Sequence, residues 1–206
     1  MYDRGMRNQL GCLLFVLFTV GACSSDSVDS NEQARRAYLG LDKSISKSLA
    51  LGFQGYNVAT NANIPTQMTM GDASGTLTIT GKVDQGTPGQ AQMNLNVGMT
   101  MYSDGKIMVD DKGNTISVTY ATSTDMTMQP LLSLKLNSSA GDTLTGTLMG
   151  DYTISGDLKG TVTLDLQLTG KFSGTAPNVM RVIGSTMVTG SAVNSDGGMY
   201  TVSVKI

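Results

Sequence analysis

The chain of 206 residues contains no histidine, no tryptophan, two cysteines and a single glutamate, Glu32. Without histidine, neither a Ser-His-Asp triad nor a Cys-His pair can form, and the commonest zinc ligand is missing. The net charge is −2 and no basic run occurs, which argues against nucleic acid as a partner. These absences favour a protein that is not an enzyme and that carries no cofactor or metal ion.

Threonine and glycine are abundant instead, with 25 residues each, whereas aromatic residues make up 5% of the chain and charged residues 15%. A Glu/Lys-rich helical protein has a different profile. Threonine suits half-buried strands and glycine suits the turns that join them, so the composition predicts a mainly β protein.

The N-terminal segment has the features of an export signal. Arg4 and Arg7 precede the apolar stretch Leu10–Val20. As a helix these 11 residues reach about 16 Å, roughly half the hydrocarbon thickness of a bilayer. The stretch is therefore too short to span the membrane and fits the apolar region of a secretory signal peptide.

The sequence Val20-Gly21-Ala22-Cys23 follows this apolar stretch. It resembles the lipobox of bacterial lipoproteins: an aliphatic residue, two small residues and a cysteine. The resemblance implies that the signal peptide 1–22 is removed and that Cys23 carries the acyl anchor, which would make the membrane a partner. Ser24, rather than aspartate, after the cysteine implies the outer membrane of a Gram-negative envelope. An ordinary signal peptide cut near Ala22 is the alternative.

Three segments are expected: the signal peptide (1–22), a Ser/Asp-rich tether (23–30) and one domain (31–206). Ser30 and Gln33 form a capping-box pattern that predicts a helix start. Apolar residues then recur at spacings of three and four, which predicts one buried helix face: Ala34, Ala37, Tyr38, Leu41, Ile45 and Leu49. Gly52, Gly55 and the Asn/Ala stretch up to Pro65 are expected to end the helix.

From Met68 onward, apolar residues alternate with threonine, asparagine and lysine, most clearly over 158–172. This alternation predicts an antiparallel sheet with one apolar and one wet face. Short turns separate the runs, so the strand order should largely follow the sequence. Several runs exceed ten residues. We therefore expect a long-stranded, curved antiparallel sheet or a partly closed barrel, with the N-terminal α-helix packed on its apolar face.

The motif Met-Thr-Met occurs three times, at Met68 and Met70, Met99 and Met101, and Met126 and Met128. In a strand, each pair would project both thioethers to the same face. The favoured interpretation is that methionine fills gaps between sheet and helix. The pairs are also candidates to line a pocket for an acyl chain or another apolar ligand, and Cu(I) binding is the least favoured interpretation.

Function is less defined than fold. The leading hypothesis is a non-enzymatic envelope lipoprotein that binds an apolar or lipid-like ligand in a cavity between sheet and helix. The alternative is a structural or interaction module that binds an envelope protein or a glycan through its polar sheet face. A third, weaker hypothesis is an aspartate-dependent hydrolase, but the only adjacent acidic pair, Asp110-Asp111, has the composition of a hairpin turn.

Overall fold

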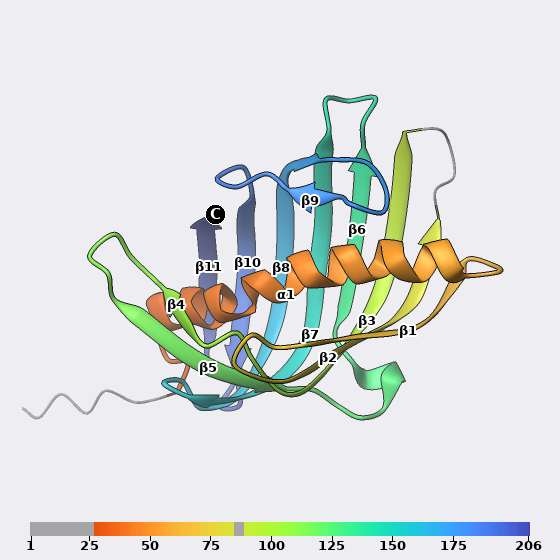
Figure 1. Ribbon diagram of the computed structural model, residues 1–206. Coiled ribbons are helices and arrows are strands. Elements are labelled where there is room, and N and C mark those ends of the chain that lie inside the picture. The colour runs from red at the N-terminus through yellow and green to blue at the C-terminus, as the bar shows by residue number, and fades with distance from the viewer. Residues whose placement is uncertain (1–26, 85–88) are drawn as a thin grey trace, which may run out of the picture.

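A computed structural model, shown in Figure 1, describes residues 27–84 and 89–206. The predicted signal peptide, Cys23 and the first part of the predicted tether lie outside the described residues. Among the residues that the structure describes, no helix combines the length and hydrophobicity needed to cross a bilayer.

The predicted helix is present as α1 (Asn31–Val58) and is about 42 Å long. Ser30 caps it, with its hydroxyl accepting a hydrogen bond of 3.2 Å from the backbone N–H of Gln33. The predicted apolar face is buried along its whole length. The helix continues through Gly52 and Gly55, where we expected it to end. A Cβ atom at Gly52 would lie 2.8 Å from Sδ of Met93, so glycine here serves close packing.

The strands are β1 (Asn63–Met70), β2 (Ser74–Asp84), β3 (Gln90–Ser103), β4 (Lys106–Met108), β5 (Thr115–Ala121), β6 (Leu131–Asn137), β7 (Thr143–Gly156), β8 (Gly160–Ser173), β9 (Met180–Arg181), β10 (Met187–Asn194) and β11 (Met199–Lys205). A short 3₁₀ helix, η1 (Met126–Met128), precedes β6. Strands β3, β7 and β8 have 14 residues each, which confirms the prediction of long strands.

The strands pair antiparallel in an order that largely follows the sequence. The exception lies between β3 and β7, where β5 and β6 are placed end to end. The first half of β3 pairs with β6, whereas its end pairs with β5 through Tyr102 and Tyr120. On the other side of β5 and β6, strand β7 pairs with both of them. The chain from β5 to β6 therefore leaves the sheet, and this excursion carries η1.

The sheet curves around α1, which lies across its concave face (Figure 1). The buried residues of the long strands point to this face and form one core with the helix, including Leu77, Met93, Leu132, Leu148 and Leu166. The polar residues alternate with them and face outward on the convex side. The expected fold, a curved antiparallel sheet with one N-terminal helix on its apolar face, is confirmed.

Candidate functional site

The space between the middle of α1 and the sheet is filled by side chains. The Tyr120 hydroxyl donates a hydrogen bond of 2.7 Å to the backbone carbonyl of Ala37 in α1. A Cβ atom at Gly40 would lie 2.2 Å from this same hydroxyl oxygen. Tyr120 also packs edge-to-face against Tyr152, with ring centroids 6.3 Å apart. A ligand between helix and sheet must therefore bind nearer the rim.

A pocket of about 360 Å³, called here the rim pocket, lies beyond this packed centre. Phe53 of α1 and Phe172 of β8 line it together with apolar residues of β3, β6 and the loop after β8: Ala91, Leu136, Ala176 and Val179. Gln90, Ser138, Asp142 and Thr175 are among its polar lining residues. Its volume falls at the lower end of the range for small-molecule sites, and its mixture of an apolar wall with a few polar groups is typical of them.

The loop that closes one side of the rim pocket is fixed to α1 by an ion pair. This loop, seen above α1 in Figure 1, carries β9. Both terminal nitrogens of Arg181 donate hydrogen bonds of 2.8 Å to the two carboxylate oxygens of Asp42. Arg181 also donates to Ser46 at 2.9 Å, and its side chain is 8% exposed.

The charges of this ion pair are well compensated. Burial is the largest single influence and opposes the charged form of Arg181, but the hydrogen bonds that it donates to Asp42, the Asp42 charge and Tyr38 together outweigh burial, so the pKa of Arg181 is raised. The hydroxyl of Tyr38 donates to Asp42 at 2.8 Å. Burial, aided by the Asp42 charge, raises the pKa of Tyr38 well above its ordinary value, so this tyrosine stays a donor.

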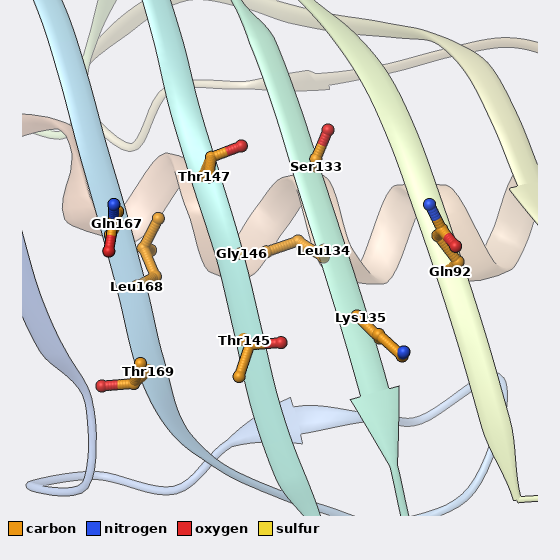
Figure 2. Close-up of a pocket in the computed structure, with 10 residues that line it drawn as sticks. All are labelled: Gln92, Ser133, Leu134, Lys135, Thr145, Gly146, Thr147, Gln167, Leu168 and Thr169. Atoms are coloured by element: carbon orange, nitrogen blue, oxygen red, sulfur yellow. The ribbon is translucent and has the colours of Figure 1, made fainter.

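A second hollow lies on the outer face of the sheet, and Figure 2 shows its lining. This polar groove has about 300 Å³ and extends over β3, β6, β7 and β8. Its floor includes Gly146, and its polar lining residues are Gln92, Ser133, Lys135, Thr145, Thr147, Gln167 and Thr169. The strand register explains this grouping, because Gln92, Lys135, Thr145 and Thr169 occupy one row across the four strands. Amide, hydroxyl and ammonium groups in a row suit a polar ligand.

The six methionines of the Met-Thr-Met motifs do not line the rim pocket or the polar groove. Met99 is buried in the core, as the gap-filling interpretation expects, whereas the other five are exposed: Met68, Met70, Met101, Met126 and Met128. Met68 and Met70 of β1 lie opposite Thr78 and Thr76 on the convex face. Packing against the helix therefore does not account for most of these residues.

Two of the three motifs also depart from strand geometry. Met101 has a positive φ of 48° next to a register shift between β2 and β3, so Met99 and Met101 do not share a face. Met126 and Met128 lie in η1 rather than in a strand. The expectation that each pair projects to one side of a strand holds only for Met68 and Met70.

Among the residues that the structure describes, every carboxyl group with a resolved pKa shift is shifted downward. Hydrogen bonds from Arg35 lower the pKa of Glu32, and those from Lys43 and Lys47 lower that of Asp72. Bonds from Asn114 lower the pKa of Asp110, which lies in the turn after β4. A general acid needs a raised pKa, so these shifts give a hydrolase no support.

A second ionic cluster, which the sequence did not indicate, joins α1 to two turns at one end of the sheet. Lys47 donates to Asp104 at 2.6 Å and to Asp72 at 2.7 Å, and lies 5.2 Å from the ring centre of Tyr102. The Tyr102 hydroxyl donates to Asp104 at 2.6 Å. Each of these polar groups has a partner within the cluster. The cluster therefore serves to hold α1 to the sheet.

Comparison with known proteins yields no relative: no family model matches the chain, and no curated protein or solved structure is significantly similar to it. Within residues 27–84 and 89–206, no group of three or more His, Cys, Asp or Glu residues is arranged to hold a metal ion.

Sequence reasoning missed most of the rim pocket. Phe172 was recognisable as the last apolar residue of a long alternating strand. Phe53 lies between the two glycines that we expected to end the helix, and Ala176 and Val179 lie in a loop without any periodic pattern. A pocket made by the end of a helix, a strand end and a loop leaves no local signal in a single sequence.

Proposed function

We propose that this protein is a non-enzymatic lipoprotein, anchored through Cys23 in the outer membrane of the bacterial envelope, that binds an apolar or lipid-like ligand in the rim pocket. The observation that carries the ligand proposal is the composition of this pocket. Two of the chain's four phenylalanines face a hollow of about 360 Å³ at the end of the helix–sheet interface. The volume suits one small apolar group or the end of an acyl chain.

The anchor proposal rests on the resemblance of Val20–Cys23 to a lipobox, and the folded domain begins only a few residues after Cys23. Val28 is buried, and its carbonyl accepts a hydrogen bond of 2.9 Å from the side-chain amide of Asn194. Cys23 lies five residues earlier, so an acyl group there would hold the domain within about 17 Å of the bilayer. Several acyl chains on one residue give a stable anchor, whereas one chain alone binds reversibly.

The ligand proposal is tested by filling the rim pocket. Ala91→Phe adds a ring at the half-buried β3 position that lines the pocket, and Ile183→Phe is a control at a side chain that is 99% exposed. We expect the wild type and the control to bind the apolar fluorescent dye N-phenyl-1-naphthylamine, and the Ala91→Phe variant to bind it about tenfold more weakly. Equal dye binding by all three proteins would exclude the rim pocket as the site. Mass spectrometry of organic extracts then identifies the natural ligand.

The anchor proposal is tested separately with Cys23→Ser. We expect this variant to lose incorporation of labelled palmitate and to keep its signal peptide, whereas Cys12→Ser is the matched control and is processed normally. Palmitate labelling that persists in Cys23→Ser would contradict the proposed anchor, whatever the result for the ligand.

The polar groove supports a second candidate function, the binding of a glycan or an envelope protein on the outer face of the sheet. Its row of amide and hydroxyl groups around Lys135 carries this candidate (Figure 2). Lys135→Glu would weaken the capture of such a partner from envelope extracts, whereas Lys205→Glu, at an exposed site on β11, would not. Identical capture by both variants would exclude the groove.

A further inference from the structure

A single charged side chain lines the rim pocket. Asp142, in the turn between β6 and β7, is the only charged residue among the described residues of its lining, and the others are apolar or uncharged. Asp142 is exposed, so it lies at the open side of the pocket rather than in its apolar interior. An apolar wall with one carboxylate at the opening suits a ligand that has an apolar chain and a head group complementary to negative charge.

The carboxylate of Asp142 is not used by the fold. In the described part of the chain it accepts no hydrogen bond and forms no ion pair, and only the backbone carbonyl of Asp142 is bonded, by the N–H of Phe172 at 2.9 Å. By contrast, the carboxylates of Asp42 and Asp104 are each bound by a cation and a tyrosine. The turn needs a residue that tolerates the positive φ of 56°, and asparagine would serve as well. The charge of Asp142 is therefore available to a ligand.

The neighbouring cations are directed away from the pocket. Lys171 directly precedes Phe172 in β8, and adjacent strand residues point to opposite faces. The ammonium group of Lys171 therefore lies on the convex side, whereas the Phe172 ring lines the pocket. Arg181, in the loop that closes the pocket, is bound by Asp42. An anionic head group at the opening would meet the charge of Asp142 without a compensating cation from the described lining.

The polar groups near Asp142 favour a hydrogen-bond donor. Ser138 belongs to the same turn, and its hydroxyl donates to the backbone carbonyl of Gly89 at 3.0 Å, so it is left as an acceptor for a ligand. The side chains of Gln90 and Thr175 can also accept. An ammonium group donates three hydrogen bonds and accepts none, so it matches these groups, whereas a carboxylate cannot use the Ser138 proton.

We propose that the rim pocket selects an amphiphile with one apolar chain and a protonated amine as its head group, and that Asp142 is the partner of the amine. The chain lies against Phe53 and Phe172, and the amine lies at the open side beside Asp142. The inference rests on the ligand proposal above and adds the chemical class of the ligand. A fatty acid of the same length binds more weakly.

The test compares octylamine, which is cationic at pH 7, with octanoate, which is anionic and has a carbon chain of the same length. Each is titrated against the full chain with bound N-phenyl-1-naphthylamine, and the loss of dye fluorescence gives its affinity. Asp142 attracts one head group and repels the other. We therefore expect the wild type to bind octylamine about fivefold more tightly than octanoate.

Asp142→Asn removes the charge but keeps the side-chain size and tolerates the left-handed backbone. We expect this variant to bind the two ligands within about a factor of two of each other. Asp111→Asn, at an exposed aspartate in the turn after β4 and outside the pocket, is the matched control and should keep the wild-type preference. The dye is uncharged, so equal dye affinity in all three proteins verifies that the pocket is intact.

Three results would overturn the inference: equal affinity of the wild type for both ligands, tighter binding of octanoate, or an amine preference that persists in Asp142→Asn. If the dye still binds and Ala91→Phe still weakens it, the ligand proposal stands and only the choice of head group is wrong. If neither the dye nor either ligand binds, both proposals are wrong.

Discussion

The two faces of this sheet are made by the same strands but have different organisation. On the concave face, leucine, valine and tyrosine side chains pack against α1 and are almost fully buried. On the convex face, threonine, asparagine and methionine remain open to solvent around a polar groove. Packing on the concave face therefore provides most of the stability, whereas the residues of the convex face are not constrained by packing.

The largest expected effect comes from breaking the ion pair on the concave side. Asp42→Ala leaves the buried guanidinium of Arg181 without its partner, and we expect a loss of about 3–5 kcal/mol in the free energy of unfolding. Glu32→Ala removes an exposed pair and should cost about 1 kcal/mol or less. Urea unfolding measures both, and similar values would show that the Asp42–Arg181 pair is not buried as described.

The same residue type allows a direct comparison of the two faces. Met93→Ala, in β3 on the concave face, should cost about 2–5 kcal/mol because it leaves a cavity. Met68→Ala, on the convex face, should change the stability by about 0.5 kcal/mol or less. A large cost at Met68 would mean that its side chain is packed.

The close approach of α1 to the sheet predicts coupling between Gly40 and Tyr120. Gly40→Ala should cost about 1–3 kcal/mol, because its Cβ would meet the Tyr120 hydroxyl at 2.2 Å. In a Tyr120→Phe background, which removes that oxygen, the same change should cost less. A double-mutant cycle measures this coupling, and strictly additive effects would contradict the contact.

The smallest expected effect concerns pH. Hydrogen bonds from Lys43 and Lys47 hold the pKa of Asp72 below its ordinary value of 3.8. Since the folded pKa is lower than the unfolded one, the stabilisation is complete above pH 3.8 and is lost as the pH falls through the folded value. The side chain is 43% exposed, so the effect is modest. The stability difference between the wild type and Asp72→Asn should shrink on acidification, and a difference independent of pH would contradict this role.

Much of the fold was predictable because its signals are local. Ser30 with Gln33 marks the helix start, and the alternation over 158–172 identifies strand β8 and its buried face. The glycines of α1 were misleading, because Gly52 usually signals a helix end and here accommodates Met93 of a distant strand. The end-to-end placement of β5 and β6 could not be predicted from local sequence either, since it depends on how β3 pairs along its length.

The candidate sites were far less predictable than the fold. The Met-Thr-Met motifs were visible in the sequence, but only the structure shows that Met99 is buried whereas Met68, Met70, Met101, Met126 and Met128 are exposed. The Asp42–Arg181 pair joins residues 139 positions apart. No sequence pattern distinguishes either residue from the other charged residues of the chain.

The alternation of residues along the chain predicts which side chains share a face, because side-chain direction in a helix or strand follows from backbone geometry. The composition of the sequence also excludes histidine-dependent chemistry. Whether an apolar side chain is covered could be read only from the folded protein, because burial depends on which residues lie opposite it. Met93 and Met68 illustrate this: one faces α1 and the other faces water, although both are methionines in strands of one sheet, β3 and β1.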